Sequence, residues 1–318
     1  MTAKSQPALH RFAVFTACFT FLTLIAGALV TSKDAGLSVP DWPLAYGKFI
    51  PPLVGGIVFE YSHRVIATFI GLLTIILAVW LAIAEPRRWV RRVGFAALAI
   101  VITQGLLGGM TVLFFQPPAV STAHATLAQM FFCVIVSLAL FTSAWWQSDL
   151  PEVESPDAGR ILSLAHWTVA AVLLQLILGA AFRHRAFGLL PHLLGAVVVT
   201  VLIFRLAGEL KRTFPRIAPL RACARVLHVL IGAQLLLGAA AWWSRGYGAA
   251  FPQPILTTVI LTVTHVVTGA LLFAATVVTT LVCRRLLRLA AITEVVLSEE
   301  FELTETADAL ELADEQTA

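Results

Sequence analysis

Charged residues are scarce in this chain. Only 13% of its 318 residues are Asp, Glu, Lys or Arg, whereas 59% are hydrophobic. Soluble globular domains carry about 25% charged residues, so this composition indicates an integral membrane protein. We attribute the net charge of +4 to basic residues that set the orientation of the chain in the membrane, and we expect no nucleic-acid partner.

Cysteine patterns that build disulfides or thiolate metal sites are missing as well. The chain has four cysteines and no Cys-x-x-Cys spacing. Cys18 and Cys133 lie inside apolar runs, and Cys223 and Cys283 lie near the face predicted to be cytoplasmic, which is a reducing compartment. We therefore expect neither a disulfide framework nor a thiolate-bound zinc.

Long apolar runs dominate what is present. Runs of about 20 residues span a bilayer as helices, and these runs lack the alternation of barrel strands. The sequence thus predicts an all-α integral membrane protein with the lipid bilayer as a partner. Its eight transmembrane helices are expected at about 12–31, 64–84, 93–114, 122–144, 161–182, 187–207, 222–243 and 257–283.

The distribution of Lys and Arg predicts the orientation. If the N-terminus is inside, sixteen of the 22 basic residues fall on inner segments and six on outer ones. The positive-inside rule then places both termini in the cytoplasm. The first run is too long for a signal-peptide core, and the leading tail is too short for an organelle transit peptide. We expect a prokaryotic cytoplasmic (inner) membrane protein with several passes.

An internal repeat runs through the odd-numbered helices. Each carries a small residue near its outer end, where membrane helices approach closely, and the next helix carries one histidine near its own outer end. Three repeats read Gln-x-x-x-Gly and the first reads Thr-x-x-x-Gly. The pairs are Gly27 with His63, Gly108 with His124, Gly179 with His192, and Gly238 with His265. The four histidines are expected at one depth, toward the outer face.

The repeat also predicts how the chain divides. The acidic, proline-containing stretch between the fourth and fifth helices splits it into two pseudosymmetric four-helix bundles. We expect an N-terminal half at 1–146, a cytoplasmic linker at 147–160, a C-terminal half at 161–288 and an acidic cytoplasmic tail at 289–318.

Histidine pairs at one depth fit a particular ligand. Two facing imidazoles suit the axial positions of a haem iron, whereas a zinc site wants more protein ligands. The alternative is that each histidine only bonds a neighbouring helix. Structural roles are expected for His10, His166 and His228, and His184 is expected in the outer loop, either solvated or at a haem edge.

The two halves differ around His63. Glu60 lies three residues before it, on the same helix face, whereas the other histidines have Ser121, Leu189 and Thr262 at that offset. A carboxylate at a membrane helix is a functional candidate, and the alternative is a surface acid paired with Arg64. The long first outer loop, with Trp42 and Tyr46, is either a lid over this half or an interfacial loop.

These motifs together resemble the haem A synthase family. The resemblance covers about residues 12–288 and rests on "GLSVPDWPLAYGKFIPP", "FEYSHR", "QGLLGG" with "STAHATLAQ", "LLPHLLGA" and "THVVTGALL". The family has eight helices in two pseudosymmetric halves, and its activity is the oxidation of a methyl group of haem O to formyl. Many members carry a cysteine pair in the first outer loop. This chain has Val39 at one of those positions, so it resembles the cysteine-free type.

The resemblance implies a role for each matching residue. Glu60, His63 and His124 match the half that handles the substrate haem, with Glu60 catalytic, and His192 and His265 match the axial ligands of a haem b cofactor. Basic residues beside the sites are candidates to bind haem propionates: Arg64 at the substrate haem, and Arg183 and Arg185 in the outer loop.

The resemblance also implies partners, and alternative functions are weighed against it. Haem O is the implied substrate, and haem O synthase and terminal-oxidase assembly factors are implied partners; the electron donor and a homo-oligomer are left open. The alternative function is a bis-histidine b-type membrane cytochrome that transfers electrons from quinol without altering haem. A transporter is disfavoured because its mid-membrane charges are missing, and a prenyltransferase because the chain has no Asp-x-x-x-Asp pair.

Overall fold

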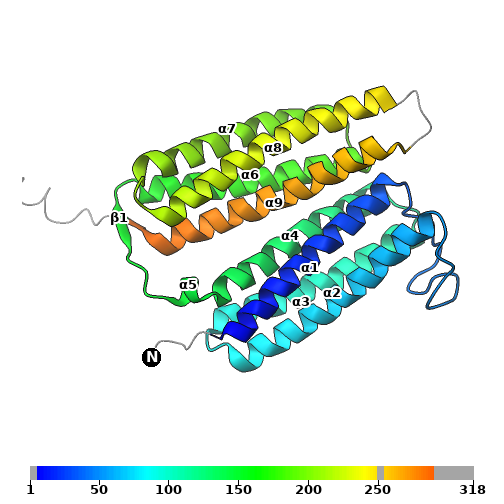
Figure 1. Ribbon diagram of the computed structural model, residues 1–318, viewed down its shortest axis with the longest axis horizontal. Helices are drawn as coiled ribbons and strands as arrows, with labels where there is room; N and C mark the ends of the chain where they lie inside the picture. Colours follow the sequence, from blue (N-terminus) through cyan, green and yellow to red (C-terminus); the bar gives the residue numbers. More distant parts are fainter. Residues whose placement is uncertain (1–5, 249–253, 290–318) are drawn as a thin grey trace, which may run out of the picture.

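The protein is seen here as a computed structural model that describes residues 6–248 and 254–289. Nearly all of this part is helical (Figure 1). The helices are α1 (Pro7–Ser32), α2 (Gly56–Ala84), α3 (Arg88–Leu113), α4 (Pro118–Thr142), α5 (Ala144–Gln147), α6 (Ala158–Arg183), α7 (Leu189–Thr213), α8 (Ala218–Gly248) and α9 (Leu256–Leu286). Apart from the short α5, each is long and apolar enough to cross a membrane, which confirms the predicted all-α membrane fold.

Several helices extend past the apolar runs that predicted them. The run expected to start at 64 belongs to α2, which begins at Gly56 after Gly55 with a φ of +53°. The run expected to start at 93 belongs to α3, which begins at Arg88. Polar and basic residues at helix ends reach the membrane interface with their charged groups, so hydrophobicity alone places the ends too far inward. Glu60 and His63 consequently lie within the first turns of α2.

The helices pack as two groups of four. Within each group, every helix contacts the next one along the chain, and the last closes on the first: α1 with α4, and α6 with α9. Figure 1 shows the two groups side by side, and α9 lies against both α1 and α4. Because α4 also contacts α6, the two groups share a continuous contact surface.

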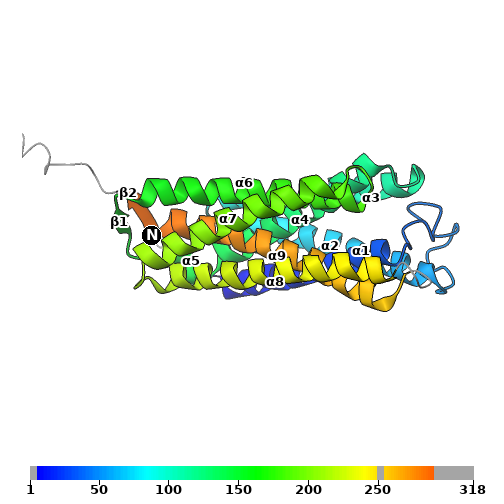
Figure 2. The same cartoon turned by 90° about the horizontal axis from the view of Figure 1, so that it is seen from above.

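All long helices run along one common direction (Figure 2). The loop at 33–55 lies at one end of the molecule, and the strands β1 (Val153–Ser155) and β2 (Leu287–Leu289) lie at the other. These strands pair in parallel, and an ion pair of 2.6 Å joins Arg288 to Glu152. No strand was expected here, and the pairing ties the linker to the end of α9. Of the acidic tail predicted at 289–318, Leu289 belongs to β2, and residues 290–318 lie outside the described residues.

Apolar side chains cover the outside of the helices as well as the core. Ile83 is 82% exposed and Leu236 is 75% exposed. Such side chains suit contact with lipid, because the hydrocarbon core offers no partner for polar groups. Polar side chains inside the helix groups therefore need a local explanation.

Candidate functional site

Each of the four repeat histidines packs against the glycine of the preceding helix with which the repeat pairs it. A Cβ atom added to any of these glycines would crowd the imidazole ring. The distance from that added Cβ to the histidine Cε1 would be 3.1 Å for Gly27 and His63, 3.2 Å for Gly108 and His124, 2.9 Å for Gly179 and His192, and 3.0 Å for Gly238 and His265. The glycines are therefore required by the rings that lie on them, as well as by helix contact.

Glutamines of the repeat hold three of the four histidines. Gln104 Nε2 donates to the His124 carbonyl oxygen at 3.0 Å, and Gln175 Nε2 donates to that of His192 at 2.9 Å. Gln234 Nε2 lies 3.3 Å from Nε2 of His265. These glutamines came into the sequence analysis only as part of the repeat, without a role of their own.

The first repeat differs from the others. Thr23 takes the place of glutamine, and its hydroxyl donates to the Phe19 carbonyl of its own helix at 2.9 Å. Among the described residues, Thr23 makes no hydrogen bond to α2. His63 therefore rests on Gly27 without a partner like those of the other three histidines.

The imidazoles of the second group of helices face each other. The ring centroids of His192 and His265 are 6.3 Å apart, and the rings are inclined at 87°. Two metal–imidazole bonds of about 2 Å on opposite sides of one ion place the ring centroids roughly 6 Å apart. This pair therefore has the separation that two axial ligands of a haem iron require.

The other pair is also close. His63 and His124 lie near enough to interact electrostatically. In all four histidines, Nδ1 is buried and has no hydrogen-bond partner, which is uncommon for a buried polar atom. Within the described residues, no three His, Cys, Asp or Glu side chains gather to hold a metal ion. The arrangement suits a metal that brings its other ligands with it, as a haem does.

Glu60 and Arg64 form a buried ion pair at 2.6 Å. Glu60 is only 4% exposed, and its second oxygen accepts the Val39 N–H at 2.9 Å. The pairing with Arg64 matches the alternative raised from the sequence, but the acid is buried and not at the surface. Glu60 is thus both one turn from His63 and bonded to the first outer loop.

Arg64 binds the same loop through backbone carbonyls. Its guanidinium donates to Asp41 at 2.7 Å, to Leu44 at 3.0 Å and to Val39 at 3.2 Å. These bonds could not be predicted from the sequence, since carbonyl positions depend on the path of the loop. In this structure the guanidinium is directed at the loop.

The loop is also organised from within. The Asp41 carboxylate accepts the N–H groups of Gly47 at 2.8 Å and Tyr46 at 2.6 Å, and the Gly47 bond foremost holds the pKa of Asp41 below its usual range. The Tyr46 hydroxyl donates to the Ser38 carbonyl at 2.6 Å. These bonds give residues 38–47 a defined shape.

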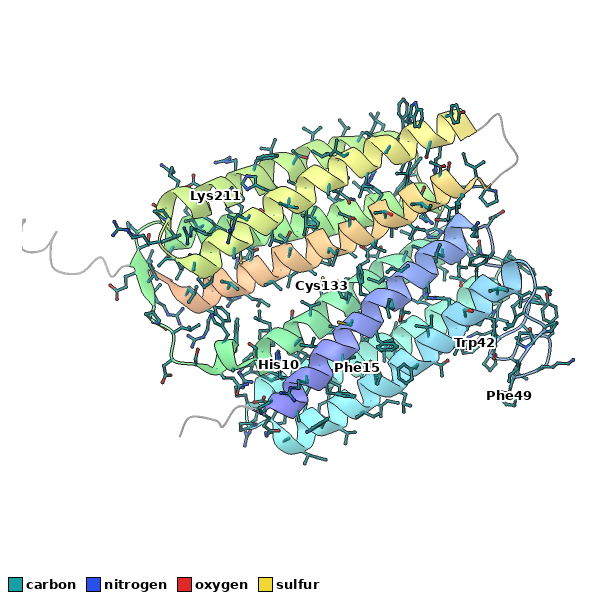
Figure 3. All side chains as sticks on the ribbon, in the orientation of Figure 1. His10, Phe15, Trp42, Phe49, Cys133 and Lys211 are labelled. Atoms are coloured by element: carbon teal, nitrogen blue, oxygen red, sulfur yellow. The ribbon has the colours of Figure 1, made fainter. Side chains whose placement is uncertain are left out.

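Trp42 connects this loop to α3. A Cβ atom added to Gly109 would lie 2.8 Å from Cδ2 of Trp42, so the indole covers the glycine next to Gly108, on which His124 rests. Figure 3 shows Trp42 where the loop meets the helix ends, whereas Phe49 lies at the far tip of the loop. Residues 38–47 therefore reach over the His63 and His124 half.

The outer end of α6 reaches across to the first group. Arg183 Nη2 donates to the Ala28 carbonyl at 3.0 Å and to Ser32 Oγ at 2.7 Å. His184 is half-buried rather than solvated, and burial lowers its pKa to about 4. Arg185 is exposed and has a φ of +61°. Arg183 and His184 thus lie between the two groups.

The remaining histidines bond backbone carbonyls. His10 Nδ1 lies 3.0 Å from the Ala139 oxygen, and His228 Nδ1 lies 2.9 Å from that of Ala224. His166 Nδ1 lies 2.6 Å from the Leu162 oxygen. These contacts agree with the structural roles expected for them.

Comparison with known proteins gives a consistent result. The COX15-CtaA family of cytochrome oxidase assembly proteins matches residues 56–190. This segment contains Glu60, His63 and His124, and it ends just before His192.

Curated relatives extend the match. The chain is 29% identical to a protein named heme A synthase from Symbiobacterium thermophilum over 260 residues, which is 73% of this chain and 85% of the relative. It is 35% identical to heme A synthase of Alkalihalophilus pseudofirmus over 41% of this chain and 44% of the relative. It is 30% identical to that of Shouchella clausii over 52% of this chain and 56% of the relative. With its eight apolar helices, the chain is a multi-pass membrane protein that is similar to heme A synthases over much of its length.

Proposed function

We propose that this protein is a haem A synthase, an oxidoreductase that converts a methyl group of haem O into the formyl group of haem A. The observation that carries the proposal is the pairing of four glycine-packed histidines, with a buried carboxylate and a covering loop at only one pair within residues 6–248 and 254–289. A symmetric electron carrier has no need for that difference. The product would serve terminal oxidases, as the family description implies.

The two halves are given different tasks. Residues 1–146 hold the substrate haem through His63 and His124, and residues 161–288 hold haem b through His192 and His265. The fit rests on the ring separation of 6.3 Å and on the buried, unpartnered Nδ1 atoms. When bound, haem b supplies one-electron transfer to the substrate half.

Glu60 is the proposed catalytic acid. It is buried, it lies one helical turn from His63, and it is the carboxylate of that turn. It would accept a proton or stabilise positive charge that develops at the oxidised carbon. Its bonds to Arg64 and Val39 hold the carboxylate in place and fix the loop over this half.

Basic residues near the sites are proposed partners of the haem propionates. Arg64 directly follows His63 in α2 and remains one of these proposed partners. Arg183 and Arg185 lie at the outer end of α6. Arg183 uses Nη2 for α1, so a propionate would meet its other nitrogens. With both termini in the cytoplasm, the sites lie toward the outer face of the bacterial cytoplasmic membrane. Haem O synthase and oxidase assembly factors are proposed neighbours there.

The test is expression in bacterial cells that make haem O but not haem A. Haems are extracted and separated by chromatography, and the purified protein is examined by a reduced-minus-oxidised spectrum. Haem A in the extract, with a b-type spectrum in the protein, is expected. A b-type spectrum with haem O left unchanged would support the bis-histidine cytochrome instead.

His166→Ala serves as the matched control for every histidine variant. His166 lies on a membrane helix, and its ring bonds its own backbone. Loss of haem A in this control would mean that histidine removal harms the fold and not the site.

A further inference from the structure

The four histidines are not held alike. Gln104 and Gln175 bond the carbonyls of His124 and His192, and Gln234 lies against the ring of His265. We call these contacts the glutamine tethers. Thr23 at the matching place beside His63 bonds its own helix instead, so the tether is missing there.

The tethers are built into the packing of the second half. Gly269 lies one turn after His265, and a Cβ atom there would lie 3.1 Å from Gln234 Nε2. Gly195, in the turn after His192, likewise has room only for the Gln175 amide, because an added Cβ would collide with its oxygen. Both ligands of the proposed haem b are therefore tethered, whereas only one ligand of the substrate haem is.

Each tethering glutamine also has a hydrogen-bond acceptor that no group among the described residues uses. The Oε1 atoms of Gln104, Gln175 and Gln234 are buried and have no hydrogen-bond partner. A backbone carbonyl only accepts, so Gln104 and Gln175 must keep their NH2 groups toward the histidines, whereas Gln234 meets a ring nitrogen and can turn either its nitrogen or its oxygen toward it. Partners of this kind orient a ligand, and their removal typically lowers metal affinity about 10–100-fold.

A cofactor and a substrate place opposite demands on their ligands. Haem b must stay through many turnovers, whereas haem A must leave after each one. Release of a haem with two axial ligands begins when the weaker ligand dissociates from the iron. His63 is also next to Arg64, which bonds three loop carbonyls, so a movement of the loop acts directly on the helical turn that carries His63.

We infer that His63 is the exchangeable haem ligand of this protein, and that the missing glutamine tether at Thr23 decides which half releases its haem. This rests on the proposed function for the identity of the two haems. The histidine pairs themselves do not depend on it.

Reciprocal exchange of the tether residue tests the inference. Thr23→Gln adds a tether, and Gln234→Thr removes one. Ala67 lies one turn after His63 just as Ala128 lies one turn after His124, so we expect the added glutamine to be accommodated as Gln104 is. Gln129→Thr is the matched control, since Gln129 is buried with an unpartnered oxygen and lies outside the repeat.

The measurement is the rate of haem loss. Purified full-length protein is loaded with iron protoporphyrin IX at both histidine pairs, and released haem is captured by excess apomyoglobin. The wild type should show a fast phase from the His63 and His124 pair and a slow phase from the other. Thr23→Gln should slow the fast phase about 10–100-fold, and Gln234→Thr should speed the slow phase by a similar factor. Gln129→Thr should change neither.

Several outcomes would overturn the inference. One is a single phase in the wild type. Another is a fast phase that Thr23→Gln leaves within a factor of two of the wild-type rate. If Gln234→Thr fails to fold, Thr23→Gln decides alone, because it removes no contact between helices. The assay needs no turnover. A protein that makes no haem A would refute the proposed function, and the fast and slow phases of haem release would still test whether His63 is the exchangeable ligand.

Discussion

Neutralising Glu60 should stall haem A formation while the protein keeps its fold and its haem b. Glu60→Gln preserves the shape of the side chain and one acceptor for the Val39 N–H, which is bonded at 2.9 Å. It loses the charged partner of Arg64 at 2.6 Å. A hydrogen bond to a charged group is worth about 1.5–3 kcal/mol, and breaking a buried ion pair costs about 3–5 kcal/mol.

This cost alone would loosen the loop, so a second variant is needed to separate anchoring from catalysis. Arg64→Gln loses the same ion pair and also the bonds to the carbonyls of Asp41, Leu44 and Val39. If Glu60 only anchored the loop, Arg64→Gln would be the slower enzyme. If Glu60 also handles a proton or charge at the reacting carbon, Glu60→Gln loses a further factor of about 10²–10⁴ and becomes the slower one.

Two assays are read together. Chromatography of extracted haems gives the yield of haem A, and limited proteolysis from the outer face reports how well residues 38–47 are held. We expect Arg64→Gln to be cleaved faster and Glu60→Gln to make less haem A. Glu85→Gln is the control, because Glu85 pairs with Arg87 at 2.7 Å just past the other end of α2. Wild-type haem A from Glu60→Gln would refute the catalytic reading.

The remaining predictions concern the histidines and the loop. His192→Ala or His265→Ala should remove the low-spin b-type spectrum from protein that still inserts, and a full spectrum in both variants would reject the assignment. A His63→Ala/His124→Ala double variant should abolish haem A while haem b persists, which the haem extract and the spectrum check; normal haem A would contradict the substrate site. Trp42→Ala gives up the apolar burial of a side chain that is 38% exposed, about 1.5 kcal/mol, so loop cleavage should rise about tenfold; unchanged cleavage would show that the indole does not hold the loop.

Periodic features of the chain could be predicted from its sequence. Apolar runs give the number of helices because the bilayer core sets their length. The contacts of Gly179 with His192 and of Gly238 with His265 are seen only in the structure, but the repeat predicted that the four histidines share one depth, since matching positions on duplicated helix pairs come to matching depths. Such arguments need only helix geometry and register.

Features that depend on the path of a loop could not be predicted. The bonds from Arg64 to three carbonyls depend on the backbone conformation of residues 38–47. The sequence of this loop has no periodic pattern that would predict that conformation. The reach of Arg183 to Ala28 and Ser32 requires the packing of one helix group on the other. The starts of α2 and α3 were misplaced because polar and charged side chains at the membrane interface let helices extend past their apolar runs.

The differences between the histidine pairs gather at one point of the chain. The missing tether at Thr23, the buried acid Glu60 and the loop bonds of Arg64 all concern the surroundings of His63. Differences that arise without selection would be scattered over four equivalent positions. Duplicated helix pairs that began as equal haem sites would need changes at only one ligand to turn a retained cofactor into an exchanged substrate. The concentration of changes at His63 therefore argues that this histidine, and not the half as a whole, is where the two sites diverged in function.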